Sequence, residues 1–223
     1  MLLGAPPEML PDEQGGASLF LAGAGVVSLF LGVRWYGLRA LGLRGHRALY
    51  AGIGFATLGW LVYFVARVFA VSSQQDLLVS ATFGRNFIYL FLFEALALQL
   101  WTFGLLFRSV ADWRDPLTAA ISTGLVFGLA GFLFFTESFT TDLNSLLFFS
   151  VWGLFYGLIR LRTGSILGLV IVQATQSLTT WYILLPETDP QPAELRLLYA
   201  VTATAYVIFI WRLWPKEEAD FRV

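Results

Sequence analysis

The chain has 223 residues and a formal net charge of −1, and 13% of its residues are charged, about half the roughly 25% of an average soluble domain. Hydrophobic residues make up 57% of the sequence and its mean hydropathy is +0.71, so the composition excludes an ordinary soluble domain and indicates a membrane protein. The absence of cysteine excludes disulfides and Cys-ligated metal sites, the single histidine, His46, excludes a multi-His site within one chain, and the near-neutral charge gives no sign of a nucleic-acid partner.

Apolar runs of about 20 residues recur along the whole chain, and an α-helix needs this length to cross the hydrocarbon core of a bilayer. Clusters of Arg, Asp and Pro, such as 112–116 and 186–192, separate these runs. The sequence therefore predicts an all-α fold, a polytopic membrane bundle of about seven transmembrane helices (six to eight). The predicted spans are 18–38, 48–71, 86–107, 116–135, 145–160, 165–185 and 197–214.

The basic residues are distributed unevenly over the predicted loops. Eleven of the fourteen fall on one side of the membrane, and Arg67, Arg85 and Arg196 fall on the other. The positive-inside bias places the richer side in the cytoplasm, so we expect the N-terminus outside and the C-terminus in the cytoplasm of a prokaryotic cell. The eleven are Arg34, Arg39, Arg44, Arg47, Arg108, Arg114, Arg160, Arg162, Arg212, Lys216 and Arg222.

Polar side chains within the predicted spans are the candidates for function, because polar groups are costly in a bilayer. Glu94 is the ionisable residue predicted to lie well inside a span, and five residues of α-helix, about 140° of turn, should point it away from Gln99. Gln99 and Thr102 share one face of the third span and form a first polar stripe. A second polar stripe lies on the sixth span, at a similar depth in the membrane. The second stripe consists of Gln173, Gln176, Ser177 and Thr180.

These two stripes allow two interpretations. They could face one another across a shared cavity. Alternatively, Gln, Ser and Thr in membrane helices join helices through hydrogen bonds of about 0.6 kcal/mol each, and Glu94 could do the same as a protonated carboxyl.

Small residues spaced four apart predict close helix packing in the second half of the chain. The GxxxG spacing lets two helix backbones approach, so we expect a compact central bundle. The pairs are Gly124 and Gly128, Gly153 and Gly157, and Gly164 and Gly168.

Three segments resemble the motifs of the CPBP family, which comprises CAAX proteases and bacteriocin-processing enzymes and is also called Abi. Residues 98–108 resemble the first motif, Glu-Glu-x-x-x-Arg-Gly, and residues 119–131 the second, Phe-x-x-x-His, with Phe127 at the Phe position. Residues 153–177, with the turn Arg-x-Thr-Gly-Ser, are similar to the segment that leads into His-x-x-x-Asn. The resemblance implies a single integral-membrane domain over 1–223. Its parts are a CPBP-like core at about 86–185, N-terminal helices at 18–71 and a C-terminal helix at about 197–214.

None of the family's catalytic residue types is present at the matching positions. In the family, a glutamate and a histidine are thought to activate water, while a histidine and the asparagine stabilise the oxyanion. An amide has no useful basicity and glycine has no side chain, so the resemblance implies a fold without its usual chemistry. The Glu, Glu, Arg, His, His and Asn positions fall on Leu98, Gln99, Phe103, Gly131, Gln173 and Ser177.

The sequence therefore favours a catalytically inactive membrane protein that binds a membrane-protein partner or a hydrophobic ligand, as a scaffold or regulatory subunit. Its remnant cavity would consist of Gln99, Thr102, Gln173, Gln176 and Ser177, with no cofactor and no metal. One alternative is an active endopeptidase with Glu94 as its atypical catalytic residue. Another is a pigment- or lipid-associated accessory subunit, suggested by the 17% aromatic content.

Overall fold

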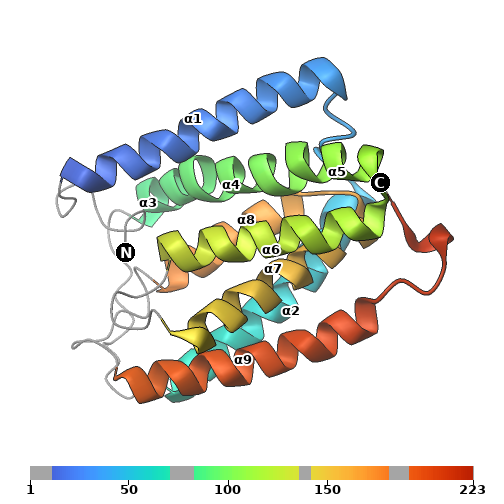
Figure 1. Ribbon diagram of the computed structural model, residues 1–223. Coiled ribbons are helices and arrows are strands. Elements are labelled where there is room, and N and C mark those ends of the chain that lie inside the picture. The colour runs from blue at the N-terminus through green and yellow to red at the C-terminus, as the bar shows by residue number, and fades with distance from the viewer. Residues whose placement is uncertain (1–11, 71–82, 136–141, 181–190, 223) are drawn as a thin grey trace.

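The computed structural model describes residues 12–70, 83–135, 142–180 and 191–222. The described residues form helical rods and loops, and the rods lie side by side in a bundle (Figure 1). The rod of α1 lies along one edge, the rod of α9 lies along the opposite edge, and the remaining rods lie between them. The all-α fold class predicted from the sequence is confirmed.

The first two helices enclose a loop that matters for the rest of the structure. Helix α1 spans Asp12–Trp35 and α2 spans Arg47–Ala70. Between them, residues 36–46 close one end of the bundle, with Gly37 and Gly42 at φ values of 82° and 85°. We refer to this end as the loop end.

The third rod is continuous from residue 83 to residue 113 but changes its helical type along its length. It packs against α1 on one side and against α8 and α6 on the other. Its two π-helical stretches surround the central α-helical turn. In chain order its elements are α3 (Phe83–Tyr89), η2 (Leu90–Leu96), α4 (Ala97–Gln99), η3 (Leu100–Leu106) and α5 (Phe107–Trp113).

Helices α6 (Pro116–Phe135) and α7 (Leu143–Thr163) form the tightest pair in the bundle. A Cβ added at Gly124 would lie 2.7 Å from the carbonyl oxygen of Gly153, and Gly128 and Gly157 face the partner backbone in the same way. Gly164 differs from these four, because it ends α7 as a left-handed cap with φ of 71°. The pair Gly164 and Gly168 therefore does not form one helix face.

The last two rods complete the bundle. Helix α8 spans Leu167–Leu178, and its Gly168 packs against the backbone of Gly52 in α2. Helix α9 spans Pro192–Leu213 and packs on α2 and α7. The short 3-10 turn η5 (Glu218–Asp220) follows, and Arg162 holds it through an ion pair with Asp220 at 2.5 Å.

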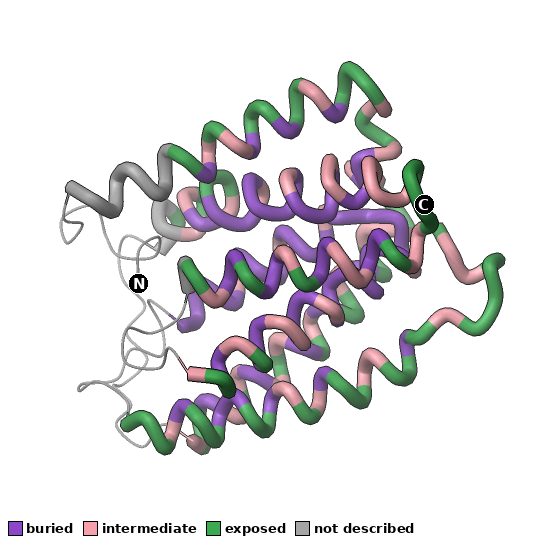
Figure 2. The backbone as a smooth tube through the Cα atoms, viewed as in Figure 1, coloured by how far each residue is buried: buried purple, intermediate pink, exposed green. Residues whose placement is uncertain are grey.

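Aromatic rings fill the space between η3, α6, α7 and α9. Phe127 lies at the centre of one group, with ring centroids 5.4 Å from Phe103 and 5.5 Å from Trp152. A second group stacks Phe148 on Tyr199 at 4.7 Å. The buried residues follow this interior, whereas α1, α2 and α9 expose their outer faces (Figure 2).

The outer faces carry apolar side chains, as a protein surrounded by lipid requires. Five helices in the described residues are long and apolar enough to cross a membrane. Two shorter apolar helices, Phe20–Trp35 and Leu167–Leu178, occupy the places of the first and sixth predicted spans. The polytopic helical bundle expected from the sequence is confirmed, and the chain is an integral membrane protein.

Candidate functional site

The third rod contains two seven-residue π-helical stretches, and the rod of α8 also ends in π-helical residues at 179–180. A π-helix bonds residue i to residue i+5 and is rare, and short π segments often occur at functional sites. Here η2 and η3 flank the α4 turn that contains Gln99. The widened turns change which side chains of this rod face α8.

Gln99 on α4 and Gln173 on α8 contact each other directly. The amide nitrogen Nε2 of Gln99 donates to Oε1 of Gln173 at 2.7 Å, and both residues are at most 1% exposed. Within the described residues, Oε1 of Gln99 and Nε2 of Gln173 have no further partner. The two stripes predicted from the sequence meet at this point through a direct amide contact, as in the second of the two interpretations above.

Glu94 lies next to this amide pair, on the side away from the loop end. Its Oε1 accepts a hydrogen bond from Oγ of Ser177, and Glu94 is 1% exposed. The second carboxyl oxygen of Glu94 has no partner among the described residues. Glu94 and Gln99 therefore contact the same helix, α8, through residues one turn apart.

This placement corrects the expectation that Glu94 points away from Gln99. That expectation used 100° per residue, as in an α-helix. A turn of the π-helix η2 holds about one residue more than a turn of an α-helix, so two residues five apart on this rod lie on one face. Glu94 and Gln99 can therefore both contact α8, where their partners Ser177 and Gln173 are four residues apart. Glu94 thus joins Gln99, Gln173 and Ser177 in one buried polar cluster.

The other predicted polar residues lie nearby, and both threonines among them bond carbonyl oxygens of their own rods. Thr102 is fully buried and donates to the carbonyl oxygen of Leu98 at 2.7 Å. Thr180 donates to the carbonyl oxygen of Gln176 at 3.0 Å and also contacts the Tyr63 hydroxyl on α2 at 3.4 Å. The side-chain Oε1 of Gln176 has no partner among the described residues.

Apolar packing occupies the remaining positions that correspond to catalytic residues of the family. Leu98 and Phe103 are fully buried, and Phe103 packs on Phe127. At Gly131, an added Cβ would lie 2.7 Å from the ring of Phe149. Since α7 brings this ring against the glycine, the position holds an aromatic contact in place of an ionisable side chain.

Two buried arginines were missed by the sequence analysis, which assigned them to the membrane surfaces. Arg67 on α2 is 2% exposed and donates to the Tyr63 hydroxyl at 3.1 Å. Arg160 on α7 is fully buried. Their positions near the ends of predicted spans suggested that they lie at the membrane surface. Each of them is flanked by apolar residues in the sequence, and this pattern could have indicated burial.

The site offers few groups that bind metals. Over residues 12–70, 83–135, 142–180 and 191–222, no three His, Cys, Asp or Glu side chains lie close enough to hold a metal ion. The cluster of Glu94, Ser177, Gln99 and Gln173 can accept and donate hydrogen bonds. Its one ionisable member is Glu94.

Comparison with known proteins supports the resemblance noted in the sequence. Residues 80–179 match the family model described as type II CAAX prenyl endopeptidase Rce1-like. This segment is Rce1-like. It contains the third rod, α6, α7 and α8, and therefore every member of the polar cluster. The predicted relation to the CPBP family is confirmed for it. No curated protein and no solved structure matches the chain.

Proposed function

We propose that the chain is a catalytically inactive, Rce1-like membrane protein that acts by binding a membrane-protein partner. The hydrogen bond between Gln99 and Gln173 carries the first half of this proposal. These are the positions at which the family has a glutamate and a histidine to activate water. An amide cannot take a proton from water near neutral pH, so the pair can join two helices but cannot serve as a general base.

The other matching positions support the same conclusion. Phe103 and Gly131 lie in aromatic packing, so no polar side chain remains at the family's arginine position or at its first histidine position. Loss of one oxyanion donor alone typically lowers the rate by about 10²–10³. Because the general base is lost as well, we expect no peptide hydrolysis faster than the uncatalysed reaction in water.

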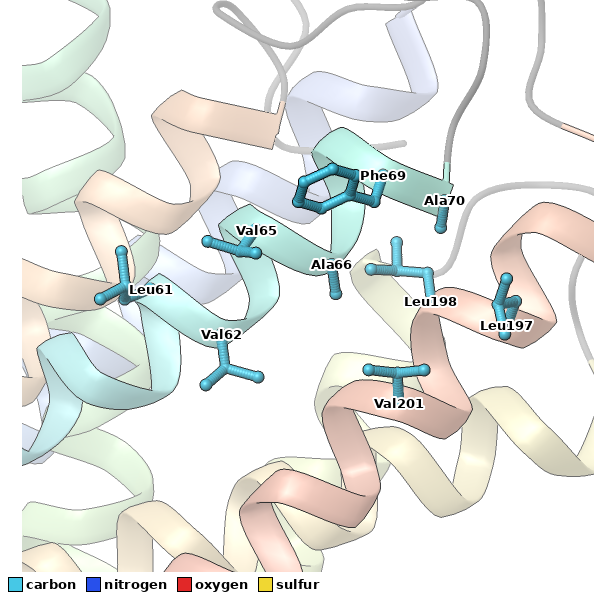
Figure 3. A pocket seen from close by; sticks show the side chains of 9 residues that line it. All are labelled: Leu61, Val62, Val65, Ala66, Phe69, Ala70, Leu197, Leu198 and Val201. Carbon is cyan, nitrogen blue, oxygen red and sulfur yellow. The ribbon is translucent and has the colours of Figure 1, made fainter.

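An apolar groove between α2 and α9 supports the binding half of the proposal (Figure 3). Its volume is about 480 Å³, and one wall carries Ala66 and Ala70, which are one helical turn apart. Small residues at this spacing allow the backbone of another transmembrane helix to approach. Phe69, which is 85% exposed, lines the groove as well and offers an aromatic anchor. We assign the groove to a transmembrane helix of the partner.

Two measurements test the two halves separately. For inactivity, the purified chain is incubated with a prenylated CAAX peptide, the substrate class in the family's name. We expect no cleavage above buffer, and cleavage that Glu94→Gln abolishes would overturn the proposal.

For binding, three chains are isolated separately from native membranes in mild detergent: the wild type, Ala66→Phe and Ala51→Phe. The Ala66→Phe side chain fills the groove, and Ala51→Phe is the control. Ala51 lies on the exposed face of α2 and does not line the groove. A membrane protein retained in stoichiometric amount by the wild type and Ala51→Phe, and lost from Ala66→Phe, supports the assignment. Equal recovery with all three chains would contradict it.

A second function, an endopeptidase that uses Glu94, is favoured by one observation. Glu94 bonds Ser177, which occupies the asparagine position of the family motif. A carboxylate at this place could take a proton from a water molecule next to the amide pair. Cleavage lost in a folded Glu94→Gln chain would establish this function, whereas loss of folding alone would make Glu94 a structural residue.

We also propose that the loop end faces the cytoplasm. Basic residues gather at this end of the bundle. They lie in the loop of residues 36–46 and at the ends of α5, α7 and α9. A cytoplasmic position for such residues follows the positive-inside bias.

A further inference from the structure

Arg160 is a buried cation without a carboxylate partner among the described residues. Its Nε donates to the carbonyl oxygen of Phe103 at 3.1 Å and its Nη2 to that of Ala40 at 2.9 Å. The guanidinium also lies 4.9 Å from the ring centroid of Phe107. These groups are neutral, so the charge of Arg160 is not compensated by any of them.

Other arginines lie close to Arg160 at the loop end. Arg44 and Arg108 both act on the Arg160 guanidinium through charge repulsion. Burial, followed by the positive charges of Arg39 and Arg108, lowers the pKa of Arg44. Like charges within reach of one another destabilise a fold unless an anion lies among them. We call this group, Arg39, Arg44, Arg108 and Arg160, the arginine cluster.

Within the described residues, one carboxylate pairs with the arginine cluster. Asp112 accepts from Nη2 of Arg108 at 2.6 Å. The four guanidinium groups of the cluster carry more positive charge than this one carboxylate can neutralise. Arg44 instead donates to two carbonyl oxygens, those of Arg39 at 3.0 Å and Arg222 at 2.8 Å.

Two N–H groups of the arginine cluster have no acceptor among the described residues. They are Nη1 of Arg160 and Nε of Arg108, and both atoms are buried. A buried donor on a charged group costs about 1–3 kcal/mol or more when it has no acceptor. Two such donors on neighbouring guanidinium groups indicate that an acceptor of negative charge belongs there.

The position of the arginine cluster within the bundle indicates which anion this is. Trp35 at the end of α1 is 59% exposed and Trp113 at the end of α5 is 72% exposed. Both helix ends lie at the loop end (Figure 1). Exposed tryptophans are enriched at the depth of the lipid headgroups. The arginine cluster thus lies at the level of the phosphate layer of the membrane.

We propose that the arginine cluster binds a phosphate group, supplied by an anionic lipid headgroup or by free phosphate. Guanidinium groups match phosphate oxygens in geometry and bond them through two parallel N–H donors. The exposed Arg39 and the half-buried Arg44 and Arg108 give the anion access from solvent, and Arg160 provides positive charge beneath them. This site is separate from the Glu94 cluster and independent of the function proposed above.

The first experiment measures the thermal unfolding midpoint of the purified chain in neutral detergent. Dioleoylphosphatidic acid is added in one sample, the matching diacylglycerol, which has no phosphate, in a second, and inorganic phosphate in a third. At about 100 times the dissociation constant, phosphatidic acid should raise the midpoint by about 5–10 °C, and the diacylglycerol should not. A rise with phosphatidic acid alone identifies a lipid source, and a rise with inorganic phosphate as well shows that phosphate is sufficient. No rise with either would overturn the proposal.

Substitutions show whether the arginine cluster is responsible. Arg108→Gln and Arg44→Gln should each weaken phosphatidic acid binding roughly tenfold or more. The control is Arg212→Gln, because Arg212 is an exposed arginine that stacks on Trp211 and lies outside the cluster. Equal weakening in all three chains would mean general surface attraction and would contradict the proposal.

Native mass spectrometry of the wild type covers the case in which the variants fail to fold. Phosphatidic acid should saturate at one tightly bound molecule per chain. Progressive addition without a saturating first molecule would contradict the proposal.

Discussion

At the scale of single residues, the polar cluster joins two helices through side chains that have few other partners. Gln99 and Gln173 form one hydrogen bond, and each keeps an amide atom without a partner among the described residues. Hydrogen bonds between membrane helices contribute about 0.6 kcal/mol on average and at most about 1.7 kcal/mol. The pair therefore contributes more to the specificity of the contact than to its total energy.

A double-mutant cycle on this pair measures the interaction. Gln99→Leu and Gln173→Leu should each destabilise the chain, because each leaves the other amide buried without its partner. The double variant should be more stable than the sum of the two losses predicts, with a coupling of about 0.6–1.7 kcal/mol. Unfolding in mixed detergent micelles gives the four free energies. Strict additivity would show that the hydrogen bond contributes nothing.

Asp142 is one of the residues whose charge should make stability depend on pH. It caps α7 by accepting from the backbone N–H of Ser145 at 3.0 Å, and it also accepts from Nε of Arg196 at 2.9 Å. These bonds, that from Ser145 first, hold the pKa of Asp142 below its ordinary value. A carboxyl with a lowered folded-state pKa stabilises the fold above its unfolded pKa of about 3.9 and loses that effect as the pH falls.

Asp142→Ala should therefore lower stability at pH 7 by about 1 kcal/mol, the typical contribution of an N-cap. The difference between the two chains should shrink as the pH falls below about 4. Unfolding curves at pH 7 and at pH 3 check this. A difference that stays constant would mean that the carboxylate charge has no role.

At the scale of elements, the helices were predictable and their helical type was not. Apolar run length and Pro or Asp boundaries located every rod, since Pro116 begins α6 and Asp142 caps α7. The π-helical turns of η2 and η3 leave no pattern of apolar residues that differs from that of an α-helix. For this reason Glu94 was placed on the wrong face, and its contact with Ser177 became visible only in the structure.

The α6–α7 contact depends on glycine at specific positions. A Cβ at Gly153 would collide with the carbonyl oxygen of Gly124 and lie 2.9 Å from the nitrogen of Gly128, and backbone atoms cannot move aside as side chains can. Gly153→Val should separate the two helices and lower the unfolding midpoint by about 5 °C or more.

The matched control for this contact is Gly54→Val on α2. Nothing lies within 4 Å of a Cβ added at Gly54, so the midpoint should change little. Both variants are compared by thermal unfolding in the same detergent. Similar midpoints for Gly153→Val and Gly54→Val would show that the close approach is not needed for stability.

At the scale of the whole molecule, one end of the bundle is built differently from the other. At the loop end, residues 36–46 close the bundle, and Arg160, Ser165 and Ile166 bond the backbone of this loop. The tail joins the same network, because Arg44 donates to the carbonyl oxygen of Arg222. The sequence indicated a basic end through its arginines. It did not show that these arginines hold the loop and the tail in place, because the acceptors are backbone carbonyls far away in the chain.

The orientation of this end in the membrane is testable, because the chain contains no cysteine and any introduced thiol is unique. Gly45 lies exposed in the 36–46 loop and Gln191 lies exposed before α9, at the other end of the bundle. With the basic end in the cytoplasm, a membrane-impermeant maleimide should label Gln191→Cys in intact cells and Gly45→Cys only after the membrane is opened. The wild type, which lacks a thiol, gives the background. Labelling of Gly45→Cys in intact cells would reverse the orientation and place the arginine cluster at the outer leaflet.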